Sequence, residues 1–307
     1  MTPPADWVLP TPAERLRVRS ADGSWLNAEA FGPVDAPTVL LAHGWTCSIG
    51  FWSPVIHRLA DDHRVVAYDQ RGHGGSDIPP TVRGYSTRAL ADDLEAVLTR
   101  VVPAGGRAVL AGHSMGGMTI MAAGGRPAVA ARTAAALLVS TGAGGLTEEV
   151  RLIPAAVRPP RLRAWLTRRI LSSPLPLGPV TGPGKAVLKH ATMGRATPPE
   201  PVEACARIVH ACPTAVRARW ADVLGELDVR TGLAAMTAPT AVVVGSADRL
   251  TPPVHAHRML AAAQAPAGLL ELPGVGHMAP AERPAEIAAE IRRLVTAHLA
   301  PERTEAG

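Results

Sequence analysis

The sequence predicts an α/β fold in which helices flank a mostly parallel, eight-stranded sheet. Short runs of β-branched and leucine residues alternate along the chain with helix-length segments, the order expected of strands joined by right-handed helical crossovers. The chain has 307 residues, of which 47% are hydrophobic, so it is long enough to bury a sizeable core.

The eight predicted strands differ in the spacing of their apolar residues. The first two, at 15–20 and 24–32, are typical of an antiparallel edge hairpin that turns at "ADGS". The later runs are almost continuously apolar, as expected of strands buried on both faces of a parallel sheet. These runs lie at 37–44, 64–69, 107–114, 135–141, 240–245 and 268–274.

Helix-length segments lie between these strands. Residues 86–102 place Leu90, Leu94 and Leu98 on one stripe, and residues 284–299 form a similar segment near the C-terminus. The interval 142–236 has little strand signal and many prolines, so we expect a helical insertion between the sixth and seventh strands. The predicted organisation is a core of residues 1–141 and 237–307, interrupted by this insertion, residues 142–236.

Positive charge is concentrated in the insertion. Residues 151–219 contain twelve Lys or Arg but only Glu200 and Glu203 as acids, whereas the whole chain carries a net charge of +5. A nucleic-acid-binding surface would be expected to spread over the fold or accompany a binding motif, so we expect no nucleic-acid partner. No window resembles a membrane span of roughly 18 apolar residues, and the first ten residues lack the order of a secretory signal. We therefore expect a cytoplasmic protein.

The strongest local motif is "GHSMG" at 112–116, which places Ser114 between two glycines directly after a predicted strand and before a predicted helix. This strand-turn-helix context is what the G-x-S-x-G motif requires, because the turn exposes the serine hydroxyl at the carboxyl end of the sheet. A serine hydroxyl becomes a nucleophile when an oriented base removes its proton. The motif therefore predicts that Ser114 is a catalytic nucleophile.

The base and its orienting acid are expected in other loops at the same edge of the sheet. His277, in "LPGVGHMAP", follows the last predicted strand, and an imidazole can accept the serine proton near neutral pH. Asp248, in "VVVGSADRLTPP", follows the preceding strand and would fix the histidine tautomer. His113, adjacent to the serine, should point away and pack or hydrogen-bond near the turn. We therefore predict a triad of Ser114, Asp248 and His277.

A tetrahedral intermediate also needs hydrogen-bond donors for its oxyanion. We expect these from the backbone N–H groups of Met115, directly after the serine, and of Trp45, in the loop "AHGWTCS" after the third strand. His43 is expected to shape that loop and, with Cys47, to take part in substrate binding. The three cysteines form no C-x-x-C pair, and we expect neither a metal nor a cofactor.

The motifs of this sequence resemble those of α/β-hydrolases and occur in the order typical of that family. They are HGW at 43–45, "DQRGHGGSD" at 69–77, GHSMGG at 112–117 and the loops of Asp248 and His277. The resemblance covers most of the chain outside the insertion, which corresponds to the cap or lid of that family. It implies the α/β-hydrolase fold, a mainly structural role for 69–77, and a small-molecule acyl substrate whose identity depends largely on the cap. Related epoxide hydrolases and haloalkane dehalogenases carry an aspartate at the position of Ser114, which argues against both activities.

The insertion contains a candidate amphipathic helix at 161–177, where Leu162, Trp165 and Leu166 share a stripe and arginines lie largely elsewhere. The stripe is typical of a cap helix that packs over an active site, and Trp165 is a candidate substrate-binding residue. The same pattern also allows weak contact with an anionic membrane surface or attraction of an anionic substrate.

The motifs favour a serine hydrolase that cleaves a carboxylic ester, lactone or thioester through an acyl-enzyme on Ser114. An acyltransferase or cyclase, or a carbon–carbon bond hydrolase, would use the same triad and remains open. A ligand receptor without catalysis is a third reading, which an intact triad disfavours. The oligomeric state does not follow from the sequence.

Overall fold

The computed structural model describes residues 5–152 and 180–299, together with Pro159, Leu162, Trp165, Leu166, Arg169 and Ser173. Its centre is a single eight-stranded sheet in the order β1-β2-β4-β3-β5-β6-β7-β8. All eight predicted strands are present, with ends shifted by at most a few residues. Their bounds are Glu14–Arg19 (β1), Trp25–Phe31 (β2), Thr38–Ala42 (β3), Arg64–Tyr68 (β4), Ala108–His113 (β5), Thr133–Val139 (β6), Thr240–Gly245 (β7) and Pro266–Leu272 (β8).

The sheet has an antiparallel edge and a parallel body. β1 pairs with β2 as the predicted hairpin, and β2 pairs antiparallel with β4, whereas every other pairing is parallel. In β5, β6 and β7 every residue is buried, which explains why their sequences are continuously apolar. The sheet is therefore mostly parallel, as predicted.

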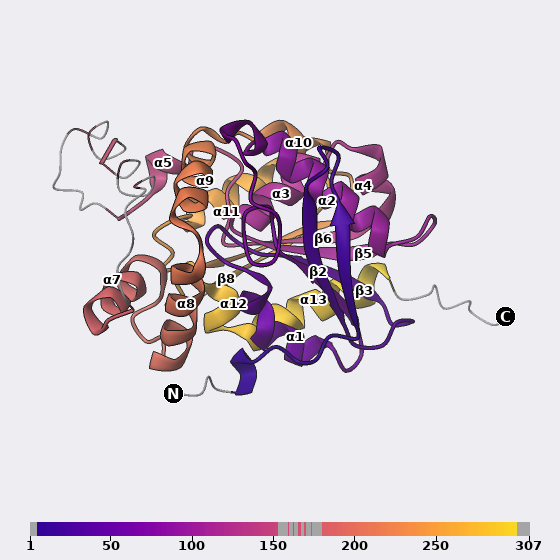
Figure 1. Ribbon diagram of the computed structural model, residues 1–307, viewed down its shortest axis with the longest axis horizontal. Helices are drawn as coiled ribbons and strands as arrows, with labels where there is room; N and C mark the ends of the chain where they lie inside the picture. Colours follow the sequence, from indigo (N-terminus) through magenta and orange to yellow (C-terminus); the bar gives the residue numbers. More distant parts are fainter. Residues whose placement is uncertain are drawn as a thin grey trace.

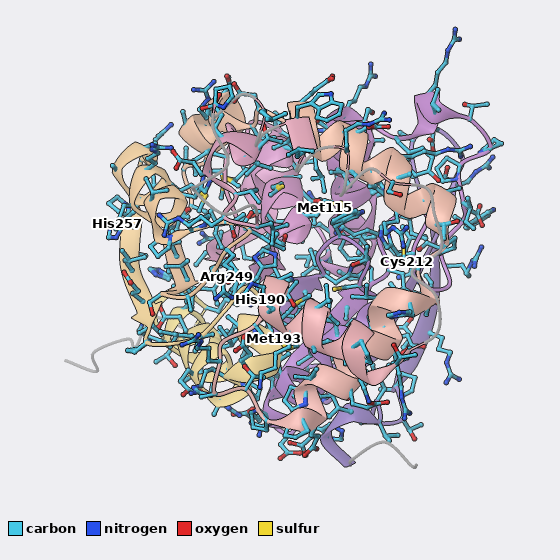
Figure 2. All side chains as sticks on the ribbon, turned by 90° about the vertical axis from the view of Figure 1, so that its left-hand side faces the viewer. Met115, His190, Met193, Cys212, Arg249 and His257 are labelled. Atoms are coloured by element: carbon cyan, nitrogen blue, oxygen red, sulfur yellow. The ribbon has the colours of Figure 1, made fainter. Side chains whose placement is uncertain are left out.

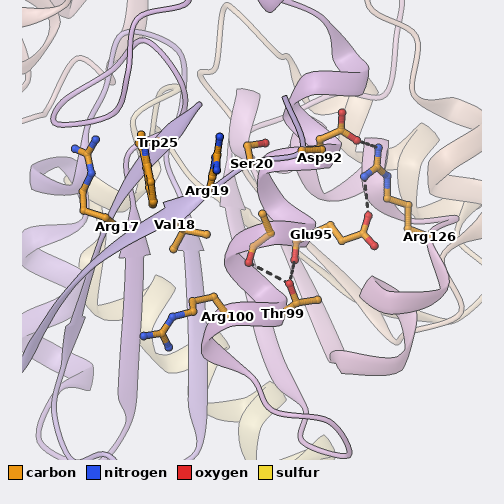
Figure 3. A pocket seen from close by; sticks show the side chains of 12 residues that line it. Arg17, Val18, Arg19, Ser20, Trp25, Asp92, Glu95, Thr99, Arg100 and Arg126 are labelled. Atoms are coloured by element: carbon orange, nitrogen blue, oxygen red, sulfur yellow. Dashed lines mark hydrogen bonds and ion pairs between the residues drawn. The ribbon is translucent and has the colours of Figure 1, made fainter. Parts of the chain in front are cut away.

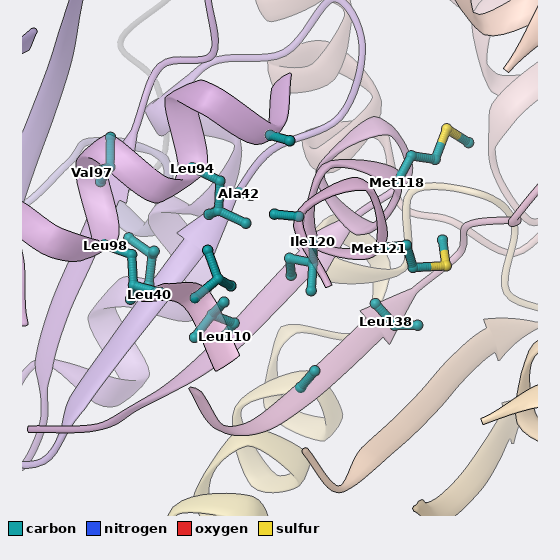
Figure 4. Close-up of a cluster of buried hydrophobic side chains, with 14 of the residues drawn as sticks. Leu40, Ala42, Leu94, Val97, Leu98, Leu110, Met118, Ile120, Met121 and Leu138 are labelled. Atoms are coloured by element: carbon teal, nitrogen blue, oxygen red, sulfur yellow. The ribbon is translucent and has the colours of Figure 1, made fainter. Parts of the chain in front are cut away.

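Two hydrophobic cores cover the two faces of the sheet, and alternate residues of each strand point into one or the other. In β3, Leu40 and Ala42 join the core beneath α2 and α3, whereas Val39 and Leu41 join the core beneath α1 and α13. Figure 4 shows the first of these cores, where Leu94 and Leu98 of α2 meet Leu40. The helices on these faces are Ser53–Leu59 (α1), Thr87–Val101 (α2), Met115–Ala123 (α3), Pro127–Arg132 (α4), Pro253–Ala262 (α11) and Pro284–His298 (α13).

The predicted helices at 86–102 and 284–299 correspond to α2 and α13. Ser86 begins α2 by accepting a hydrogen bond from the N–H of Ala89 at 3.1 Å, a regular N-cap. Four short helices complete the core: Ala5–Trp7 (η1), Ile49–Trp52 (η2), Val82–Gly84 (η3) and Ala279–Glu282 (α12).

The insertion is helical in its described part and lies between β6 and β7. Its helices α7, α8 and α9 gather at one side of the sheet (Figure 1), where α8 packs on α12 and η2. Its last helix, α10, packs instead on α3 and α11 of the core. The bounds are Leu146–Glu149 (α5), Gly182–Thr192 (α7), Pro199–Ala211 (α8), Thr214–Glu226 (α9) and Arg230–Ala235 (α10).

The predicted amphipathic helix at 161–177 lies mostly outside the described residues. Within it Leu162, Trp165, Leu166 and Arg169 are helical, and Arg169 lies over the Trp165 ring, 5.9 Å from its centroid. None of the helices in the described ranges combines the length and the hydropathy that a membrane crossing needs.

Candidate active site

Ser114 lies on a sharp turn between β5 and α3. Its backbone angles are φ 50° and ψ −117°, a conformation that costs a non-glycine residue about 1–3 kcal/mol. The neighbouring glycines leave room for this turn, because a Cβ on Gly112 would lie 2.5 Å from the backbone of Gly116, and one on Gly116 would collide with the carbonyl of Ala42. The turn leaves the Ser114 side chain on the wall of a cavity.

The three predicted triad residues meet at the carboxyl end of the sheet. His277, in the loop after β8, places Nε2 at 3.0 Å from Oγ of Ser114, and its Nδ1 lies 2.9 Å from Oδ2 of Asp248. Because a carboxylate can only accept hydrogen bonds, the ring proton of His277 lies on Nδ1 and Nε2 is free to accept from the serine. The arrangement is that of a nucleophile, a base and an orienting acid.

Asp248 is held by donors that no motif in the sequence indicates. Its Oδ1 accepts hydrogen bonds from the N–H groups of Leu250 and Thr251, and its Oδ2 accepts one from the Thr251 hydroxyl at 2.9 Å. The same hydroxyl lies 3.2 Å from Nδ1 of His277. Thr251 thus orients both acid and base, and no spacing rule in the sequence distinguishes it from other threonines.

His113 supports the loop that carries His277. Its Nε2 donates to the carbonyl of His277 at 2.9 Å. Its Nδ1 is buried and has no hydrogen-bond partner within the described residues, and burial holds the pKa of His113 well below its usual value. The ring is therefore neutral and fixes the loop that carries His277, in line with the hydrogen-bonding role expected from the sequence.

The two expected oxyanion donors are close to the serine in different ways, because Trp45 lines the same cavity as Ser114 and Met115 follows Ser114 as the first residue of α3. Neither group donates a hydrogen bond to an acceptor in the described part of the chain. The Trp45 indole instead anchors the loop to the insertion, because its Nε1 donates to the carbonyl of Arg217 in α9 at 3.1 Å. A donor for an oxyanion has to be free of other acceptors, and both N–H groups meet this condition within the described residues.

His43 shapes this loop from inside the core and does not contact the cavity. Its Nδ1 donates to the carbonyl of Gly44 at 2.7 Å, and its Nε2 accepts from the N–H of Gln70 at 3.0 Å. Burial lowers its pKa to about 4, so the ring is neutral. The expected loop-shaping role agrees with this geometry, but the expected substrate contact does not, because the side chain is completely buried.

The segment 69–77 holds the same loop in place. His73 accepts a hydrogen bond at Nε2 from the N–H of Thr46, which has a positive φ of 63°. Asp69 accepts one from the N–H of Ile49 at 2.8 Å, and buried Arg71 forms an ion pair with Asp93. His73 and Asp69 thus hold the Trp45 loop, and Arg71 is fixed to α2 through Asp93, in agreement with the structural role that the resemblance implied.

The triad opens into a cavity of about 820 Å³ between core and insertion. Its wall is mainly apolar, with Met118, Leu146, Leu188 and Leu224 among the lining residues. Trp165 lines it as expected, with more than half of its side chain exposed.

Cys47 does not line the cavity, contrary to our expectation. It packs into the core beneath α1 and α13, where burial raises the pKa of its thiol. A second hollow, of about 770 Å³, lies at the edge hairpin, where Arg17 and Arg19 flank the Trp25 ring (Figure 3). It contains none of the triad residues. Among the described residues no cluster of three His, Cys, Asp or Glu side chains could hold a metal ion.

Comparison with known proteins shows the family of this chain. A model of the alpha/beta hydrolase family matches residues 39–290. The chain belongs to the alpha/beta hydrolase family. The structure of this chain is similar to that of a thermophilic esterase from Thermogutta terrifontis, with a TM-score of 0.73 and 25% identity over 93% of this chain and 99% of that one.

Two curated relatives of this chain come from Mycobacterium tuberculosis. "Probable oxidoreductase EphD" is 36% identical over 123 residues, 40% of this chain and 21% of that protein. "Epoxide hydrolase A" is 37% identical over 110 residues, 36% of this chain and 33% of that protein. The matches therefore span a third or less of either relative, and the activities of these relatives do not transfer directly to this chain.

Proposed function

We propose that the protein hydrolyses carboxylic esters through an acyl-enzyme on Ser114. The observation that carries the proposal is the continuous chain of contacts from Ser114 Oγ to His277 Nε2, at 3.0 Å, and from His277 Nδ1 to the Asp248 carboxylate, at 2.9 Å. Through these contacts His277 can take the proton of Ser114, and the positive charge that His277 gains is paired with the buried Asp248 carboxylate.

The reaction has two halves. Ser114 Oγ attacks the ester carbonyl carbon while His277 Nε2 takes the hydroxyl proton, and the N–H groups of Trp45 and Met115 stabilise the oxyanion. The intermediate collapses when the carbon–oxygen bond to the alcohol breaks, and the alcohol leaves with the proton from His277. Water then attacks the acyl-enzyme by the same route, which releases the acid and restores the serine.

A serine nucleophile favours acyl substrates over epoxides. If Ser114 opened an epoxide, the product would be an alkyl ether, which has no carbonyl for water to attack and could not be released by this site. An acyl-serine keeps its carbonyl beside the oxyanion donors, so the enzyme can turn over.

The cavity suggests which part of the substrate is recognised. Its mainly apolar wall and volume of about 820 Å³ suit an apolar acyl or alcohol group of drug-like size. A lactone or thioester with similar groups would react by the same steps.

Product analysis tests the proposal. Wild type should convert p-nitrophenyl esters and a lactone panel to free acids, and Ser114→Ala should lose this activity while keeping its melting temperature. If an added alcohol captured most of the acyl group in preference to water, acyl transfer would replace hydrolysis as the function. Equal ester turnover by Ser114→Ala would refute the acyl-enzyme.

A further inference from the structure

Glu282 is a buried carboxylate that the triad does not use. It ends α12, five residues after His277, and is only 7% exposed. Within the described ranges no Lys, Arg or His forms an ion pair with it. A buried carboxylate without a cation is costly unless hydrogen bonds satisfy its oxygens, so the partners of Glu282 indicate what it stabilises.

Its two oxygens hold two different loops. Oε1 accepts a hydrogen bond at 3.0 Å from the N–H of Gly276, the residue before the catalytic histidine. Oε2 accepts one at 2.8 Å from the N–H of Gly194 and another from the Thr197 hydroxyl, both in the loop between α7 and α8. Glu282 therefore bridges the histidine loop and the insertion.

Backbone contacts join the same two loops. The carbonyl of Thr192, the last residue of α7, accepts from the N–H of His277 at 2.7 Å and from that of Met278 at 3.1 Å. A Cβ on Gly276 would collide with the backbone of Met193, so the loops pack backbone against backbone. In Figure 2, Met193 lies beside His190 and Arg249, and the Arg249 guanidinium donates to the His190 carbonyl.

The insertion side of this bridge also forms the cavity wall. Leu188, Ala191 and Thr192 of α7 line the cavity above Ser114, whereas Glu282 does not line it. The wall that meets the substrate is thus bonded directly to the backbone of the catalytic base.

We propose that Glu282 is a positioning residue that fixes the His277 imidazole relative to Ser114 by bonding its loop to the α7–α8 loop of the insertion. The inference rests on the proposed function, because it assumes that His277 is the base. It assigns to the insertion a part in holding the catalytic geometry as well as in enclosing the substrate.

The chemistry of the bridge requires the carboxylate. All three partners of Glu282 are donors, and the two N–H groups cannot turn to accept. A glutamine would place an amide NH₂ against one of these N–H groups, whereas the Thr197 hydroxyl could rotate to accept. Glu282→Gln should therefore separate the loops without a large change in side-chain volume.

Kinetics of the full-length protein test the proposal. For hydrolysis of p-nitrophenyl butyrate, Glu282→Gln should lower kcat by up to about 10²-fold, the loss expected from a misplacement of about 1 Å in the catalytic geometry. KM should change less than kcat, because Glu282 itself does not line the cavity. The rate at which a fluorophosphonate modifies Ser114 should fall by the same factor as kcat.

Two further variants separate positioning from general loss of structure. Thr197→Val removes one donor from the insertion side. It should also lower kcat, but by less than Glu282→Gln does. The double variant should lose less activity than the product of the single effects, because both substitutions break one shared contact. Glu286→Gln, at a half-buried carboxylate on α13 that pairs with Arg283, is the matched control and should behave as wild type.

The outcomes distinguish a failure of the positioning role from a failure of the proposed function. If folded Glu282→Gln and Thr197→Val reacted with the fluorophosphonate at the wild-type rate, the positioning role would be refuted while the proposed function stood. A rise in KM with unchanged kcat would refute it equally. If wild type itself were not modified at Ser114, the proposed function would fail, and this inference with it.

Discussion

Asp248 is the residue whose surroundings most restrict its chemistry. Two N–H groups and the Thr251 hydroxyl donate to it in addition to His277 Nδ1, and its side chain is fully buried. Such a site accommodates an acceptor and disfavours any group that must donate. The carboxylate therefore fixes the proton of His277 on Nδ1.

We expect Asp248→Asn to lower kcat by about 10⁴-fold, because an amide NH₂ facing Nδ1 favours the histidine tautomer that cannot accept the serine proton. Steady-state kinetics with an ester substrate, with circular dichroism as a check on folding, measure this. The control is Asp222→Asn, the same substitution at an exposed carboxylate of α9. An Asp248→Asn enzyme within tenfold of wild type would show that Asp248 is not the orienting acid.

At the level of residues, the sequence was informative where chemistry is tied to a local pattern. Ser114 lies in a recognisable turn, and Asp248 and His277 each follow a strand, so their meeting could be predicted. Thr251 and Glu282 have no such pattern, because their importance comes from contacts between loops distant in sequence. His43 and Cys47 lie in a motif loop, but that loop points these two side chains into the core.

Among the elements, strands and long helices were the most predictable. Their hydrophobic spacing of two or about 3.6 residues follows directly from burial on the sheet faces. The packing of α10 on α3 and α11 was not predictable, because amphipathic spacing shows that a helix packs but not on which partner. The same limit applies to α7, whose C-terminal end is bonded to the histidine loop.

The arginines of the predicted helix at 161–177 lead to a prediction about this single element. If this helix contacts anionic lipid, the protein should cosediment with phosphatidylglycerol vesicles at low salt, and about 0.5 M salt should release it, because the attraction of surface charges is screened over roughly 10 Å or less. Arg161→Gln with Arg163→Gln should weaken binding. The paired control is Arg15→Gln with Arg100→Gln, on the core hairpin and α2. Absence of cosedimentation at low salt would contradict the predicted contact.

Across the whole molecule, three neutral histidines lie buried around the carboxyl edge of the sheet. Burial lowers the pKa of His43 to about 4 and that of His73 to about 3, and holds the pKa of His113 well below its usual value. In the unfolded chain the pKa of each histidine would be about 6.5. Between roughly pH 6.5 and pH 4 the unfolded state therefore binds more protons than the folded state, so stability falls as the pH falls.

We expect the free energy of unfolding to decrease below about pH 6.5 by about 1.4 kcal/mol per pH unit for each of these histidines. Urea unfolding at pH 7.5, 6 and 5 measures the slope. His73→Asn should reduce it, whereas His257→Gln, at an exposed site, should leave it unchanged. Constant stability from pH 7.5 to pH 5 would show that these side chains are not buried as neutral rings.

The sheet brings three loops from distant parts of the chain to one edge, and the central claim is that they make Ser114 a nucleophile. Intact-mass measurement after incubation with a fluorophosphonate tests this claim most directly. We expect one adduct on wild type and none on Ser114→Ala. A wild-type protein that gains no adduct, or a Ser114→Ala variant that gains the same one, would contradict it.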